Sequence, residues 1–173
     1  MHRMVLALMG LAMAASGLVS GPAAAQTLPE RGERTCWGRA YTQTHLQAHP
    51  GQHIQQMILV LDYPAEFDQV NFQVRAVTVD DPYTQWLTDG GCHQEPGSAN
   101  ATCYVWCDGG GFDLAPEAGG DSLLLLNHSF ALSSCGEPME SEDDPDAFMR
   151  LDADAENETY RLYRLRPEMC GGE

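Results

Sequence analysis

The chain of 173 residues contains no lysine, and all nine of its basic residues are arginine. This absence excludes a lysine nucleophile, a Schiff base and the lysine of a phosphate-binding P-loop. Acidic residues number 25, so the net charge at pH 7 is −16. Nucleic acids and anionic membrane surfaces attract basic proteins, so we expect neither as a partner. We interpret the charge as a source of solubility rather than as a docking face for a basic partner.

Motifs of several enzyme classes are also missing. There is no G-x-S-x-G elbow, and the adjacent pair His128-Ser129 does not have the geometry of a catalytic triad. Cys103 and Cys107 are separated by three residues, whereas disulfide oxidoreductases carry C-x-x-C. These absences indicate a protein that is not an enzyme. A small hydrolase with dispersed carboxylates needs no local motif and is the least favoured alternative.

Long apolar runs are scarce, with one exception at the N-terminus. A basic start is followed by an apolar run from Met4 to about Val19 and by Ala23-Ala24-Ala25 before Gln26. We therefore expect residues 1–25 to be a cleaved secretory signal peptide, which predicts a periplasmic or secreted protein. The run is too short for a membrane anchor, and none is expected.

All six cysteines follow the predicted cleavage site. An even number in an exported chain predicts three disulfides, for which fifteen pairings are possible. We favour Cys92–Cys103, Cys107–Cys135 and Cys36–Cys170, the last of which would join the two ends of the mature domain. The cysteines are Cys36, Cys92, Cys103, Cys107, Cys135 and Cys170.

The pattern of the mature chain predicts a mostly β fold. Residues 70–79 alternate between apolar and polar side chains, as in a half-buried antiparallel strand, and residues 56–63 form a second apolar, β-branched run. About eight short strands predict a single disulfide-stapled antiparallel β-sandwich or small barrel over residues 36–173. One short helix, capped by Thr42 or Thr44, should end before Pro50. Residues 26–35 should form a loose lead-in.

Other stretches favour turns. Residues 80–91 and 93–100 are rich in turn residues, Asn127-His128-Ser129 should separate two strands, and 136–146 should form an acidic loop.

The stretch "CYVWCDGGGFDL", residues 103–114, is the most distinctive part of the chain. Cysteines four apart on a strand lie about 13 Å apart, too far to share a metal or to bond to each other. Asp108, Gly109, Gly110 and Gly111 could form a phosphate-binding nest, but a strand follows them rather than a helix. We favour a tight hairpin turn or a bulge at these four residues.

Histidines provide the strongest metal candidate. If residues 44–49 are helical, His45 and His49 lie on one face, at a spacing that suits zinc or copper. The competing interpretation is a surface helix with exposed histidines, and we expect no other cofactor. Residues 152–163 fail as a calcium loop, because the sixth position is Asn157 and the twelfth is Tyr163.

Aromatic residues could line a ligand groove or pack beneath loops. Large aromatics are mostly buried, which favours packing. If Cys103 and Val105 face the core, however, Tyr104 and Trp106 face outward, where aromatic side chains often mark binding surfaces. The candidates are Trp37, Tyr41, Trp86, Tyr104 and Trp106.

Four segments together, "RTCWGRAYTQTHLQAHP", "CYVWCDGGGFDL", "LSSCG" and "YRLYRLRPEMC", resemble a group of uncharacterised small secreted or periplasmic proteins from GC-rich Gram-negative bacteria. The resemblance implies an exported location and the six-cysteine framework, and it carries over no activity. The sequence thus predicts a non-catalytic exported binding or structural module with an unknown protein or small-molecule partner. The alternative is a zinc- or copper-binding periplasmic protein that uses His45 and His49.

Overall fold

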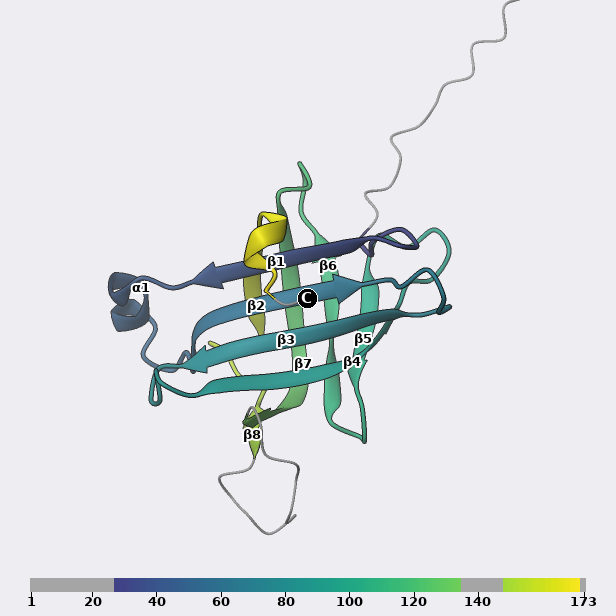
Figure 1. Ribbon diagram of the computed structural model, residues 1–173. Coiled ribbons are helices and arrows are strands. Elements are labelled where there is room, and N and C mark those ends of the chain that lie inside the picture. The colour runs from purple at the N-terminus through teal and green to yellow at the C-terminus, as the bar shows by residue number, and fades with distance from the viewer. Residues whose placement is uncertain (1–26, 135–147, 172–173) are drawn as a thin grey trace, which may run out of the picture.

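The computed structural model describes residues 27–134 and 148–171. Eight antiparallel strands close into a barrel, in which the strands at the front of Figure 1 cross those at the back steeply. The predicted signal peptide, the acidic loop and Cys135 lie outside the described residues. The described residues form nine strands, of which β8 pairs with β7 and lies outside the closed ring. They are β1 (Arg34–Ala40), β2 (Ile54–Asp62), β3 (Val70–Thr78), β4 (Gln85–His93), β5 (Ala101–Val105), β6 (Gly110–Pro116), β7 (Ser122–Ser134), β8 (Phe148–Leu151) and β9 (Thr159–Arg164).

The barrel closes because β7 is long enough to join several partners. Its first half pairs with β6 on one side and with β9 on the other, and β9 in turn pairs with β1. Its second half pairs with β8 and touches β4 at Trp86 and Leu87. The predicted antiparallel β class is therefore confirmed, and of the two predicted architectures the barrel is the one formed.

The interior of the barrel is filled by apolar side chains. Strand β3 alternates strictly, with Val70, Phe72 and Val74 buried and the residues between them half-buried, as the sequence pattern predicts. Phe112 contacts both Phe72 and Phe130, with ring centroids 4.9 and 5.2 Å apart. Because the interior is a packed core, a ligand has to bind at the rim or on the outer surface.

Two strands were missed by the sequence analysis. Residues 80–91 were expected to be turn-rich, but β4 spans Gln85–His93 despite Asp89, Gly90 and Gly91, residue types that strands disfavour. A Cβ on Gly90 would lie 2.5 Å from the Phe72 ring, so that glycine is required by the packing. Strand β1 was likewise missed, because Gly38 and two arginines interrupt its apolar pattern.

The expected turn at Asn127-His128-Ser129 is also wrong. These residues form a kink within the continuous strand β7. Ser129 has φ of 70°, and its backbone N–H donates to Asn127 Oδ1 at 2.8 Å. The kink lies where β7 leaves β9 and begins to pair with β8. The residues that suggested a turn therefore mark the point at which β7 changes its pairing partner.

Two of the predicted disulfides are formed. Cys92–Cys103 joins directly paired residues of β4 and β5, and Cys36–Cys170 ties the C-terminal segment to the outer face of β1. A short 3₁₀ helix, η1 (Pro167–Met169), leads into Cys170, and Figure 1 shows this segment against β1. Disulfides persist in oxidising compartments, so the protein belongs in one. The described residues include no helix of the length and apolarity that a membrane span requires.

The segment Thr27–Glu33, which we call the strap, is anchored rather than loose. Leu28 belongs to the main core cluster and is 9% exposed, and Thr27 Oγ1 donates to the carbonyl of Ala99. Hydrogen bonds join the strap to Tyr63, with Gly32 donating to its carbonyl and Glu33 accepting from its N–H. The strap therefore forms part of the barrel rim.

Candidate ligand-binding site at the barrel rim

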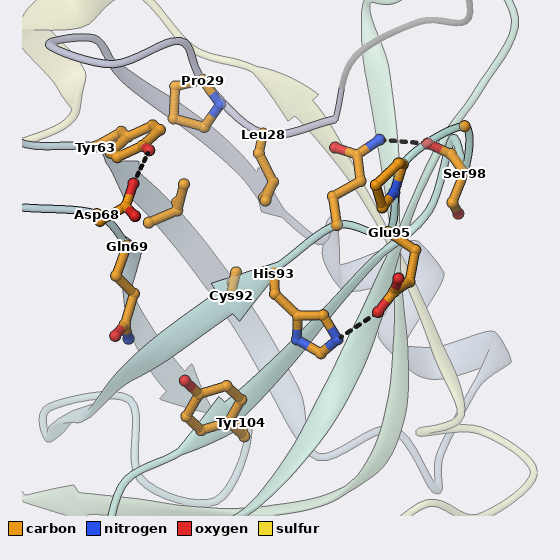
Figure 2. Close-up of a pocket in the computed structure, with 14 residues that line it drawn as sticks. Leu28, Pro29, Tyr63, Asp68, Gln69, Cys92, His93, Glu95, Ser98 and Tyr104 are labelled. Carbon is orange, nitrogen blue, oxygen red and sulfur yellow. Dashed lines mark hydrogen bonds and ion pairs between the residues drawn. The ribbon is translucent and has the colours of Figure 1, made fainter.

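A cavity of about 660 Å³ forms a notch in the rim of the barrel. It lies between the β2–β3 and β4–β5 loops, and Leu28 and Pro29 of the strap border it (Figure 2). Its volume is within the range of about 300–1,000 Å³ that is common for small-molecule sites. We call this cavity the rim notch.

One wall of the rim notch is held in place by Arg31. Its guanidinium donates to Asp68 Oδ1 at 2.5 Å and to the carbonyl of Phe67 at 2.6 Å, and it lies 4.8 Å from the centroid of the Tyr63 ring. The Tyr63 hydroxyl donates to Asp68 at 3.2 Å, a contact drawn in Figure 2. A single arginine thus fixes both the strap and the β2–β3 loop, which makes this wall preorganised.

The opposite wall comes from the β4–β5 loop. His93 Nε2 lies 3.9 Å from Glu95 Oε1, and both side chains are more than half exposed (Figure 2). Within the loop, Gln94 Nε2 donates to the carbonyl of Ser98 at 2.6 Å. The wall therefore offers an imidazole and a carboxylate on a hydrogen-bonded loop.

The rest of the lining of the rim notch includes Cys92, Tyr104 and Gln69. Cys92, from the β4–β5 disulfide, lies at the centre, and Tyr104 closes the lower side in Figure 2. The Gln69 Nε2 atom is buried and has no hydrogen-bond partner within the described residues. An unsatisfied buried donor is costly, so this amide destabilises the surroundings of the rim notch unless a side chain rotates to meet it.

A second hollow of about 420 Å³ lies on the outer barrel surface and is bordered by Trp106. The rings of Tyr104 and Trp106 meet edge to face, with centroids 5.3 Å apart, and the two residues are 41% and 42% exposed. Tyr104 lines the rim notch, so this aromatic pair stands between the two hollows. These two side chains therefore face outward, as the alternative interpretation of the sequence required. The favoured interpretation, packing, holds for Trp37 and Tyr41, which are buried, and Trp86 is half-buried.

Carboxyl groups with shifted pKa values lie away from the rim notch. A hydrogen bond with the Asn157 side chain is the main cause that lowers the pKa of Asp154. Side-chain hydrogen bonds with Thr84 and Ser122 likewise lower the pKa values of Asp81 and Glu117. Such groups are held in their ionised form, so they are poor general acids near neutral pH.

The predicted histidine pair lies on α1 (Gln43–Ala48) and at its C-cap, far from the rim notch (Figure 1). The rings of His45 and His49 are stacked, with centroids 4.4 Å apart, and His45 Nε2 is 3.0 Å from Gln52 Oε1. Ring nitrogens bind metals in the plane of the ring, so stacked rings would have to rotate to share an ion. The described residues contain no cluster of three or more His, Cys, Asp or Glu side chains that could hold a metal.

The tight turn predicted at residues 108–111 is displaced toward the N-terminus. Gly109 donates to the carbonyl of Trp106, and the two central residues, Cys107 and Asp108, have φ of 58° and 61°. This is the φ pattern of a type I′ hairpin turn. Gly110 and Gly111 begin β6. Cys107 lies in the turn after β5 and not on that strand, so the expectation that Cys103 and Cys107 share one strand is wrong. Cys107 is exposed and bonds to no other cysteine of the described residues; because Cys135 lies outside them, the third disulfide stays a prediction.

Most residues of the rim notch were not identified from the sequence. Gln69, His93 and Glu95 come from loops and strand ends and form no local motif. The one useful signal was the pair Tyr104 and Trp106, whose alternation with Cys103 and Val105 predicts outward side chains.

Comparisons with protein-family models, with curated proteins and with solved structures found no match. The resemblance to small secreted or periplasmic proteins therefore stays a prediction, and the function has to be argued from the site.

Proposed function

We propose that this protein is a non-catalytic exported module that binds a polar ligand at the rim notch. The observation that carries the proposal is a cavity of about 660 Å³ lined by the exposed polar side chains of His93 and Glu95. The Arg31 contacts and the Cys92–Cys103 disulfide hold the walls of that cavity in place. A preorganised wall reduces the entropy lost when a ligand binds.

Export is supported by two features, the predicted signal peptide and the disulfides. Both are expected of a protein that functions in the periplasm or outside the cell. The absence of lysine and of the enzyme motifs supports a binding role rather than catalysis.

The proposal can be tested with a fragment library screened by ligand-observed NMR, followed by chemical-shift mapping on ¹⁵N-labelled mature protein. We expect the hits to shift amides of residues 91–98 and of residues 68–70. His93→Ala should weaken these hits. The control His49→Ala changes a histidine outside the rim notch and should leave them unchanged.

Shifts scattered over the barrel, or hits that ignore His93→Ala, would refute a site at the rim notch. The alternative, capture of zinc or copper by His45 and His49, makes a different prediction for the same pair of variants. Calorimetric titration of either metal would then give heat that His49→Ala abolishes and His93→Ala preserves.

A further inference from the structure

The outer face of strands β1 to β5 carries a continuous row of residues that ends at the aromatic pair. Strand pairing aligns Arg34 with Asp62, Asp62 with Asn71, Asn71 with Gly91, and Gly91 with Tyr104. Directly paired residues of neighbouring strands share one face of a sheet. The exposed Arg34 and Tyr104 at the two ends identify that face as the outer one.

A second row runs beside the first. Val60 pairs with Gln73, and Gln73 pairs with Asp89, whose carbonyl accepts from the N–H of Trp106. Each row thus ends at one ring of the aromatic pair, and the hollow of about 420 Å³ lies over both rows. We call the two rows together the outer track.

Next to the aromatic end of the outer track, a glycine makes room for polar groups. A Cβ on Gly91 would lie 2.0 Å from Gln69 Nε2 and 2.9 Å from the Tyr104 hydroxyl. The unpartnered amide and the hydroxyl therefore both lie over Gly91. This point joins the outer track to the rim notch, because Gln69 and Tyr104 also line the latter.

Charge argues against an anionic ligand. Asp62 and Asp89 outnumber Arg34, which has its own partner within the protein, so a polyanion is disfavoured. The acids of the rim notch have partners of their own, because Asp68 pairs with Arg31 and Glu95 lies near His93. The amide of Asn71 and the NH₂ group of Gln73, whose Oε1 accepts from Arg75 Nε at 2.7 Å, line the hollow and can meet the ligand. Amide groups both donate and accept hydrogen bonds.

Strand addition of a peptide is disfavoured for a different reason. Each of β2, β3, β4 and β5 is already paired with a neighbour on both sides. Peptides that bind by β-augmentation require an unpaired edge, and within the described residues these four strands have none.

From these observations we infer that the outer track binds a neutral oligosaccharide. The sugar rings would stack on Tyr104 and Trp106, and their hydroxyls would bond to the amides of the two rows. Aromatic rings supply a rigid apolar surface for such stacking. The inference rests on the proposed function and extends the site from the rim notch across the barrel surface.

The length of the outer track suits a chain of several sugars. Five strands span four inter-strand spacings, or roughly 19 Å at about 4.8 Å each. One spacing is close to the length of one hexose unit, so we expect affinity to rise with chain length up to about four units.

The test is a glycan array of neutral oligosaccharides with different linkages, followed by calorimetry on the mature protein with the best probe at one to six units. Trp106→Ala and Tyr104→Ala should each weaken binding about five- to tenfold, the effect of losing one stacked ring. Trp106→Tyr should retain most of the affinity, which separates ring stacking from a folding defect. The matched control is Tyr83→Ala, because Tyr83 is 97% exposed and does not line either hollow.

Three outcomes would overturn the inference. These are the absence of binding across the array, equal affinity for one unit and for four, and binding that is indifferent to both aromatic variants. Tetralysine included as a probe gives a further refuting result if it binds and the neutral sugars do not. If fragments still map to residues 91–98 in any of these cases, the proposed rim-notch function survives although the oligosaccharide assignment fails.

Discussion

Gly110 is the residue at which backbone geometry is most restrictive. Its φ is +82°, and a Cβ there would lie 2.0 Å from the carbonyl oxygen of Ser129. We predict that Gly110→Ala lowers the free energy of unfolding by about 3 kcal/mol, because a clash with the backbone adds to the left-handed conformation. Urea unfolding followed by circular dichroism measures this change.

Gly97 provides the matched control for this substitution. Its φ is +83°, but no atom lies within 4 Å of the position that a Cβ would occupy there. Gly97→Ala should therefore cost only the conformational penalty of about 1–2 kcal/mol. Equal effects at the two positions would show that the contact with Ser129 is unimportant.

The same region shows why single residues were hard to assign from the sequence. Three consecutive glycines indicate a turn, yet left-handed angles fall on Cys107 and Asp108. Gly110 is instead required at a bulge, where the register between β6 and β7 shifts. That requirement comes from a carbonyl of β7, distant in the sequence, and so leaves no local signal.

Among the structural elements, the strap depends on one exposed arginine. The Arg31 and Asp68 side chains are 46% and 92% exposed, so their ion pair contributes less than about 1 kcal/mol to global stability. We predict that Arg31→Ala leaves the urea midpoint almost unchanged but speeds amide exchange in residues 27–33. Hydrogen-exchange mass spectrometry reports both the strap and the rest of the barrel.

Arg150→Ala is a suitable control for the strap. It removes an ion pair to Asp152 of similar exposure, in which Arg150 Nε lies 3.4 Å from Asp152 Oδ1. Exchange in the strap should not respond to it. If Arg31→Ala also leaves strap exchange unchanged, the burial of Leu28 and the hydrogen bonds to Ala99 and Tyr63 hold the segment without the arginine.

The alternation of apolar and polar residues identified strands that have one buried face and one more exposed face. Strand β3 could be predicted because one of its faces is buried and the other is not. Strand β4 could not, because Gly90 and Gly91 are required by Phe72, Gln69 and Tyr104, which belong to other segments. Closure of the barrel through β7 depends on pairing between segments that are distant in the sequence. The local sequence pattern therefore could not predict it.

At the scale of the whole molecule, the two disulfides should differ in their effect on stability. Cys36 and Cys170 are 134 residues apart, whereas Cys92 and Cys103 are 11 apart. In the loop-entropy model the first bridge contributes about 5 kcal/mol and the second about 3 kcal/mol. Double alanine variants of each pair, compared by urea unfolding, should show the larger loss for Cys36 and Cys170. The reverse order would mean that the disulfides do not stabilise the protein mainly by restricting the unfolded chain.

Stability should also decline at both extremes of pH. Hydrogen bonds lower the pKa values of Asp81, Asp154 and Glu117 below their ordinary values of 3.8 and 4.5, so their stabilisation is complete above those values. It is then lost as the pH falls through the lower folded-state values. Burial raises the pKa values of Tyr41 and Tyr160 above 10.0, so stability falls as the pH rises past 10.

Tyr160 allows the alkaline part of this prediction to be tested. Its hydroxyl donates to Asn157 Oδ1 at 2.7 Å, inside the barrel. Tyr160→Phe should lower stability at pH 7 and at the same time reduce the further loss above pH 10. A pH profile parallel to that of the wild type would exclude Tyr160 as the source of the alkaline transition.

The Cys36–Cys170 bridge has a mechanical consequence. The Cα atoms of the two residues are 5.5 Å apart, and the whole barrel from β2 to β9 lies between them in the sequence. Tension applied through the strap and through residues beyond Cys170 would pass across this bridge and bypass those strands. Under oxidising conditions the barrel would then resist pulling as a covalent link does, and reduction would convert it into a chain that extends strand by strand.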